Sequence, residues 1–168
     1  VDFHLFTDTE EILPGHNPNV IRTFRSILAE RDVSVHTGSA VTEVRPDLLR
    51  TEFGPEISAD EILWVTAAGA PSWPAEAGLE VDAQGFVKVS DTLQSVSHPD
   101  VFAAGDLATM VNHPRPKSGV FAVRQGKPLA QNLRRVLLDR VPRTFAPQKK
   151  FLSLITTGDQ YAVASRSR

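Results

Sequence analysis

The segment that most constrains the fold of this chain is an apolar run that ends on a glycine and an aspartate, residues 101–106. A second apolar run, residues 62–70, ends on small residues earlier in the chain. Both runs predict strands, and small residues at a strand's carboxyl end let a ligand approach the backbone. Because α/β sheets bind ligands at these ends, the two runs predict a dinucleotide site. Asp106 is the candidate acceptor of hydrogen bonds from a sugar or ribityl hydroxyl.

The composition excludes several kinds of chemistry. The 168 residues include no cysteine, so disulfides, thiolate nucleophiles and cysteine-based metal sites are excluded within this chain. A net charge of −2 gives no general attraction to nucleic acid or to an anionic membrane. The five histidines lack the spacing of a metal motif. Since the chain begins at Val1, inside an expected strand, we expect it to be part of a longer protein. Its N-terminus shows no basic segment followed by an apolar one, and we expect a cytoplasmic location.

Alternation, helical periodicity and turn residues together predict an α/β order of elements. Strands are expected over residues 1–6, 33–36, 61–68, 86–89 and 100–104, with hairpins at 42–53 and 151–164. Asn17 and Pro18 favour a helix start, and that helix is expected to end before Arg31. A second helix is expected from Ser118 to about Leu138. Its expected apolar face consists of Phe121, Ala122, Leu129, Leu133, Val136 and Leu137.

Three segments resemble the pyridine nucleotide-disulfide oxidoreductases, flavoproteins with two dinucleotide-binding domains. Residues 101–106 match the pattern (V/I)(F/Y)AxGD, with which that family re-enters its flavin domain. Residues 66–69 look like the exit strand of the nicotinamide domain. Residues 6–15 are similar to that domain's second strand and its LLPG turn. The resemblance implies partial FAD/NAD(P)-binding, Rossmann-like domains followed by a terminal β-hairpin.

The resemblance also implies domain boundaries. Residues 1–68 would be a partial NAD-binding domain, and residues 69–145 the return segment of a FAD-binding domain. Residues 146–168 would begin a truncated C-terminal domain. The G-x-G-x-x-G fingerprints that bind the pyrophosphates of FAD and NAD are both absent from this sequence. The resemblance therefore implies the missing N-terminal half of the flavoprotein as a partner. We therefore expect the chain alone to hold neither cofactor tightly.

The site residues follow from the same resemblance. Asp106, with Gly105 and Leu107 beside it, would contact the ribityl chain of FAD. The helix start at Gly119, Val120 and Phe121 would point at the flavin pyrimidine, since a helix N-terminus suits negative charge. The remaining implied contacts are to the nicotinamide cofactor, and they are Ala68, Gly69 and Asp8. An acid near the ribose favours NADH over NADPH. No catalytic side chain and no metal are implied.

Within the superfamily, residues 116–126 and 151–165 are similar to the NADH-dehydrogenase-like flavoproteins associated with selenide, water dikinase. That likeness implies hydride transfer from NADH to FAD, then to an acceptor that the sequence does not name. It also implies the dikinase, a selenophosphate synthetase, as a partner. Val120 and Arg124 stand where type II NADH dehydrogenases carry glutamines, which does not support quinone as the acceptor.

Simpler explanations compete with these. Residues 105–106 can be a plain turn after a strand. The basic cluster, Arg134, Arg135, Arg140, Arg143, Lys149 and Lys150, can be a solvated helix end. Alternatively it can dock onto membrane headgroups or a fused dikinase domain, which would make the protein membrane-peripheral. Nucleic acid is not expected because no aromatic stacking platform accompanies the charges. The rival function is a non-catalytic interaction or scaffold module beside a selenophosphate synthetase, using this cluster and the edge of the terminal hairpin.

Overall fold

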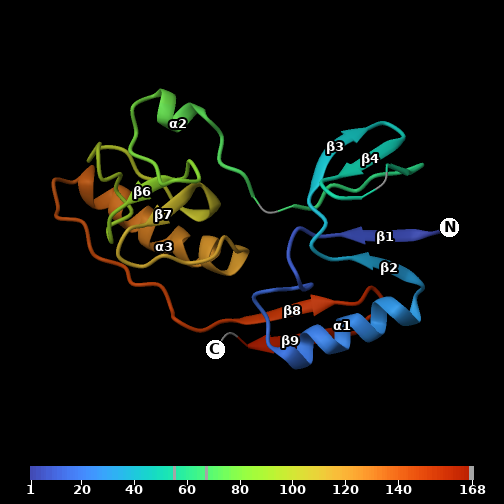
Figure 1. Cartoon of the computed structure of the whole chain (residues 1–168). Helices are drawn as coiled ribbons and strands as arrows, with labels where there is room; N and C mark the ends of the chain where they lie inside the picture. The colour runs from blue at the N-terminus through green and yellow to red at the C-terminus, as the bar shows by residue number, and fades with distance from the viewer. Residues whose placement is uncertain (55, 67, 167–168) are drawn as a thin grey trace. The chain divides into compact units, whose positions relative to one another are not determined.

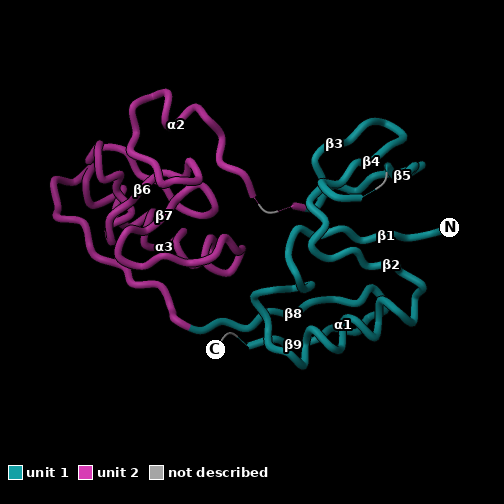
Figure 2. The backbone as a smooth tube through the Cα atoms, in the orientation of Figure 1, with its two compact units in different colours: residues 1–65, 150–168 teal, residues 66–149 magenta. Residues whose placement is uncertain are grey.

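The computed structural model describes residues 1–54, 56–66 and 68–166, and it divides the chain into two compact units. Unit 1 comprises Val1–Val65 and Lys150–Arg168, and unit 2 comprises Thr66–Lys149 (Figures 1 and 2). The assignment of residues 1–68, 69–145 and 146–168 to cofactor-binding domains stays a prediction, because compactness does not report which cofactor a unit binds.

Unit 1 begins with the predicted strand, helix and strand. β1 (Phe3–Phe6) pairs in parallel with β2 (Val33–His36), and α1 (Pro18–Glu30) connects them. The Asn17 side chain caps α1 by accepting hydrogen bonds from the N–H groups of Asn19 at 3.1 Å and Val20 at 3.2 Å. The cap and the first helical position therefore lie where the sequence predicts them.

Two predicted hairpins complete unit 1. β3 (Val41–Arg45) and β4 (Leu48–Thr51) pair antiparallel, and the short β5 (Ile57–Ser58) adds to β4. β8 (Leu152–Thr156) pairs antiparallel with β9 (Ala162–Arg166). Both hairpins confirm the sequence pattern, since each pair flanks a turn of polar residues.

The β8–β9 hairpin is fastened to the α1 region by side chains distant in sequence. The Arg31 guanidinium donates to the carbonyl oxygen of Thr157 and lies 3.1 Å from a carboxylate oxygen of Asp159. His16 Nδ1 lies 2.7 Å from the hydroxyl of Ser165, which is buried. The C-terminal hairpin is thereby part of unit 1.

Unit 2 is built around a short parallel pair, β6 (Val87–Val89) and β7 (Ala108–Met110). α3 (Gly119–Val136) lies within the helix expected from Ser118 to about Leu138. The short helix α2 (Trp73–Glu76) was not predicted from the sequence. The buried core consists of Val87, Val89, Leu93, Ala103, Ala108 and Met110. Leu129 of α3 packs against this core and so places the helix beside β6 and β7.

The strand predicted at residues 61–68 is wrong for the residues described. None of residues 61–66 or Ala68 is in a strand, and Ala67 lies outside the described residues. Leu63, Trp64 and Val65 are 87%, 59% and 83% exposed. An apolar run forms a central strand only where neighbouring strands bond its backbone, and no described strand pairs with this segment.

The strand predicted at residues 100–104 is also wrong. Phe102 forms only an isolated antiparallel bridge with Gln94. The chain then enters a single 3₁₀ turn, η1 (Gly105–Leu107), and β7 begins after it. Asp106 therefore precedes a strand, whereas the motif predicted that it would follow one. Around this bridge the N–H of Ala103 donates to the carbonyl oxygen of Leu93 at 3.1 Å, and the N–H of Ser95 donates to that of Val101 at 2.7 Å, and the pairing extends no further as a strand.

No helix in the described ranges combines the length and the apolar character needed to cross a membrane.

Candidate functional site

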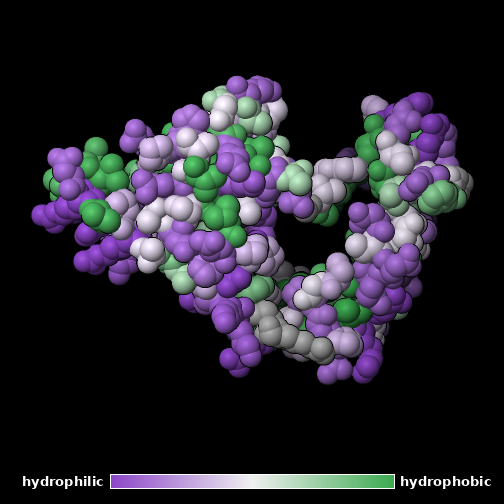
Figure 3. Space-filling model, turned by 60° about the vertical axis from the view of Figure 1, so that its left-hand side comes forward, coloured by the Kyte–Doolittle hydropathy of each residue, from purple (hydrophilic) through white to green (hydrophobic). Residues whose placement is uncertain are grey.

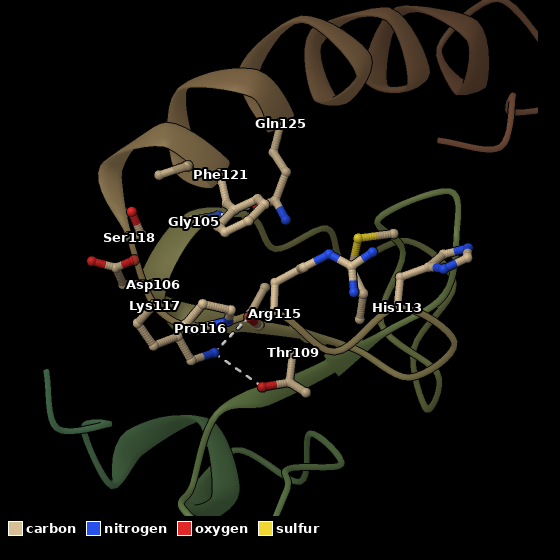
Figure 4. A pocket seen from close by; sticks show the side chains of 13 residues that line it. Gly105, Asp106, Thr109, His113, Arg115, Pro116, Lys117, Ser118, Phe121 and Gln125 are labelled. Atoms are coloured by element: carbon tan, nitrogen blue, oxygen red, sulfur yellow. Dashed lines mark hydrogen bonds between the residues drawn. The ribbon is translucent and has the colours of Figure 1, made fainter. Parts of the chain in front are cut away.

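The candidate site is a hollow in unit 2 where the η1 turn faces the start of α3 (Figure 4). The loop of residues 113–118 forms its third side. The hollow has a volume of about 20 Å³. A space of this size holds about one water molecule, so these residues offer a wall for a large ligand and do not enclose it.

The turn at Gly105 is held against α3. Gly105 has a φ of +69°, and a Cβ placed there would lie 3.4 Å from the Cβ of Ala122. Its N–H donates to Oε1 of Gln125 at 2.5 Å. Gln125 is only 6% exposed, so this bond satisfies a buried amide. The left-handed backbone and the close helix explain why glycine occupies this position.

Asp106 presents its carboxylate beside the first turn of α3. The Asp106 side chain is exposed, and Leu107 next to it is partly buried against the core. Figure 4 shows Asp106 and Ser118 at one end of the hollow and His113 at the other. The structure thus places Asp106 near the start of α3, and its contact with the ribityl chain of FAD stays a prediction.

The N-terminus of α3 offers backbone donors. Ser118 occupies the N-cap position, but its side chain makes no capping hydrogen bond. The N–H of Phe121 donates to the carbonyl oxygen of Ser118 at 3.0 Å. The N–H groups at the very start of a helix lie outside its regular bonding pattern, so those of Gly119 and Val120 are suited to an acceptor on a ligand. Gly119 is exposed, Val120 is partly buried, and Phe121 is 5% exposed and lines the hollow.

Lys117 connects this helix start to β7. Its Nζ donates to the carbonyl oxygen of Ala108 at 2.7 Å and lies 3.0 Å from the hydroxyl of Thr109. The same nitrogen lies 3.9 Å from the centroid of the Phe86 ring. Burial lowers the pKa of Lys117, although the nearby carboxylates, that of Asp106 among them, act in the opposite direction. These contacts therefore hold Lys117, the residue that precedes the N-cap Ser118, against β7.

Asp82 completes the network beneath the loop. Its carboxylate accepts hydrogen bonds from the hydroxyl of Thr109 at 2.6 Å and from the N–H groups of Gln84 and Phe86. Burial alone would raise the pKa of Asp82, but these hydrogen bonds and the charge of Lys117 lower it overall. The linked groups Asp82, Thr109 and Lys117 thus join three segments around the site.

The predicted contacts to a nicotinamide cofactor lie elsewhere. Asp8 is exposed just beyond the carboxyl end of β1 in unit 1, and Ala68 and Gly69 are exposed at the start of unit 2. None of the three lines the hollow at Gly105. A wider hollow of about 780 Å³ in unit 1, between β3 and residues 60–64, contains none of them either.

Sequence reasoning missed Gln125, Lys117, Thr109 and Asp82 as parts of this site. One signal was available for Gln125. It lies at helical spacing between Phe121 and Leu129, so an amide stands on the apolar face of α3 and requires buried partners. No comparable signal exists for the others, since their contacts join residues far apart in the sequence.

Comparison with known proteins decides the family. The model of the pyridine nucleotide-disulphide oxidoreductase family matches residues 1–126. The chain belongs to this family. The match includes β1, α1, the η1 turn with Asp106 and the first turns of α3.

Two curated relatives are 29% and 30% identical to this chain over the residues that align. A type II NADH:quinone oxidoreductase of Haemophilus influenzae is 29% identical over 135 residues, which cover 70% of this chain and 30% of that protein. A dihydrolipoyl dehydrogenase of Haloferax volcanii is 30% identical over 139 residues, covering 72% and 29%. The chain therefore spans less than a third of the length of these relatives.

Solved structures show the same fold. An FAD-dependent pyridine nucleotide-disulphide oxidoreductase from Desulfovibrio vulgaris aligns with a TM-score of 0.72 at 27% identity, covering 93% of this chain and 40% of that one. The water-forming NADH oxidase of Lactobacillus brevis aligns with a TM-score of 0.71 at 18% identity, covering 98% and 37%. These likenesses confirm the α/β, Rossmann-like fold class predicted from the sequence.

Proposed function

We propose that this chain is part of an FAD-dependent oxidoreductase that takes electrons from NADH. The observation that carries the proposal is the placement of Asp106 beside the uncapped N-terminus of α3, within the segment that the family model matches. A carboxylate accepts hydrogen bonds from hydroxyl groups, and helix N–H groups donate to carbonyl oxygens and anions. The ribityl hydroxyls and the pyrimidine edge of FAD are groups of these two kinds, so the residues present fit this cofactor.

FAD, when bound, would supply the two-electron chemistry by accepting hydride from NADH and passing the electrons to an acceptor. The chain's own residues would bind and orient. Gly105 would let the backbone approach the cofactor, and Asp106 would bind the hydroxyls of the ribityl chain. Gln125, bonded to Gly105, and Lys117, bonded to Ala108, would hold the turn and the start of α3 in position. Exposed Asp8 would receive the adenosine ribose of NADH in preference to the phosphate of NADPH.

The names of the two curated relatives support a dehydrogenase, and they indicate that the electron acceptor differs within the family. The relative from Haemophilus influenzae is named an NADH:quinone oxidoreductase, and that from Haloferax volcanii is named a dihydrolipoyl dehydrogenase. The chain has no cysteine with which to exchange a disulfide. Arg124 is exposed on α3, where glutamines were expected for a quinone enzyme, and we leave the acceptor open.

The experiment uses the complete polypeptide encoded by the gene, reconstituted with FAD under anaerobic conditions. Adding one equivalent of NADH should bleach the absorbance band of oxidised flavin, and NADPH should do so more slowly. A protein that binds FAD stoichiometrically but is not reduced by either nucleotide would overturn the proposal.

A second candidate is an interaction module beside a selenide, water dikinase, with no redox role. The observation that favours it is an exposed apolar face of the terminal hairpin, where Leu152 and Leu154 of β8 are 58% and 69% exposed. Co-purification with the dikinase together with complete absence of flavin binding would favour the module. A cytoplasmic or membrane-peripheral location is part of both proposals.

A further inference from the structure

The C-terminal end of α3 carries an exposed apolar and basic surface that the proposed redox function does not use. We name it the α3-end patch, and it consists of Arg134, Leu137, Leu138, Arg140 and Val141. Leu137, Leu138 and Val141 are 84%, 54% and 79% exposed, and both arginines are exposed. Leu137 was expected on the buried face of the helix, and the structure corrects that expectation because the helix ends before it at Val136.

The patch is fixed in shape by its own hydrogen bonds. Arg135 donates from Nε to the carbonyl oxygen of Val141 at 2.5 Å, which folds the turn back onto the end of the helix. Asn132, 1% exposed, donates to the carbonyl oxygens of Thr92 and Arg143 and accepts from the N–H of Arg143. These bonds fix the backbone that follows α3, in a conformation that leaves the side chains of Leu137, Leu138 and Val141 exposed.

Charge is strongly segregated toward this part of the chain. Residues 119–150 contain eight of the 18 lysines and arginines but only one of the 20 aspartates and glutamates, Asp139. α3 itself has no acidic residue. The small net charge of −2 therefore conceals a basic segment in an otherwise acidic protein. Figure 3 shows hydrophobic residues bordered by hydrophilic ones on the surface of unit 2.

We propose that the α3-end patch binds the surface of an anionic lipid bilayer, with Leu137, Leu138 and Val141 at the acyl boundary and Arg134 and Arg140 at the headgroups. Exposed leucine and valine between arginines is the composition of an interfacial membrane contact, in which apolar burial and attraction to anionic lipid act together. The positive charge concentrated in residues 119–150 is complementary to the negative lipid headgroups, although the net charge of the whole chain is not. The proposal does not depend on FAD binding, so it can fail or hold independently of the proposed function.

The first test measures where the protein touches the vesicle. Because the chain has no cysteine, Leu137→Cys can carry a single environment-sensitive fluorophore, and Leu154→Cys on β8, 69% exposed, is the matched control. Vesicles of phosphatidylcholine with phosphatidylglycerol should shift the emission of the label at position 137 to the blue and leave that at 154 unchanged. An equal shift at both positions, or no shift, would overturn the proposal.

The second test measures charge. Arg134→Glu and Arg22→Glu change the net charge equally on exposed helical positions, one in the patch and one on α1. Arg134→Glu should lower the partition coefficient on anionic vesicles about tenfold, and Arg22→Glu less than about twofold. Circular dichroism of both variants checks that they fold. Equal losses would show attraction to the chain as a whole and reject the patch.

The third test separates a membrane from a protein partner. Leu137→Ser with Leu138→Ser should weaken vesicle binding severalfold while all basic residues remain. Undiminished binding by this variant would contradict acyl contact. A label at position 137 that shifts with protein concentration in the absence of vesicles would assign the patch to a second copy of the chain and overturn the membrane proposal.

Discussion

Gly105 is a site residue whose backbone conformation limits substitution. Its φ of +69° lies in the left-handed region, and Ala122 lies close to where a side chain would project. We expect Gly105→Ala to lower the free energy of unfolding by about 1–2 kcal/mol. Gly126→Ala, within α3 and with open space around it, should instead raise it by about 0.5–1 kcal/mol. Urea denaturation measures both, and a loss at both positions would refute the backbone argument.

Asp82 makes the stability of unit 2 depend on acid. Its pKa is lowered in the folded state, so its stabilising contribution is complete above about pH 4 and is lost as the pH falls through the folded value. We expect Asp82→Asn to flatten the fall in unfolding free energy below pH 4, whereas Asn in place of the exposed Asp2 leaves it unchanged. An identical acid profile for wild type and Asp82→Asn would contradict the assignment.

At the scale of elements, Arg31 links the end of α1 to the β8–β9 hairpin. Arg31→Ala removes the hydrogen bond to Thr157 and the ion pair with Asp159. We expect amide hydrogen exchange in residues 152–166 to become severalfold faster, with little change at β6 and β7. Arg22→Ala, an exposed residue on the same helix, is the control. Unchanged exchange in the hairpin would show that Arg31 does not hold it.

The elements that the sequence predicted correctly are those with local causes. α1 has its cap at Asn17 and a regular apolar face, and the two hairpins have their turn residues between alternating strands. The strands at 61–68 and 100–104 were predicted wrongly because a strand depends on a partner that composition does not reveal. The site divides in the same way. The motif indicated Gly105 and Asp106 as candidates, but the bond that Gln125 accepts from Gly105 and the bond that Lys117 donates to Ala108 arise only in the folded chain.

At the scale of the whole molecule, exposed apolar residues without regular structure follow β5 in the sequence, at the end of the first stretch of unit 1. Leu63 and Trp64 are side chains that chymotrypsin recognises, and both are exposed. The core residues of unit 2, such as Val89 and Leu93, are fully buried. We therefore expect limited chymotrypsin treatment to cut first at residues 63–64. A first cut within residues 87–110, detected by mass spectrometry, would contradict the fold of unit 2.

In the proposed function, Asp106 is the residue through which this chain would hold the ribityl chain of FAD. The most direct measurement is the dissociation constant of FAD for the complete gene product, obtained by fluorescence titration of the wild type, Asp106→Ala and the control Asp100→Ala. Loss of a carboxylate that bonds the ribityl hydroxyls should raise the constant for Asp106→Ala by about tenfold or more and leave Asp100→Ala like the wild type. Equal affinity of all three proteins for FAD would contradict the account.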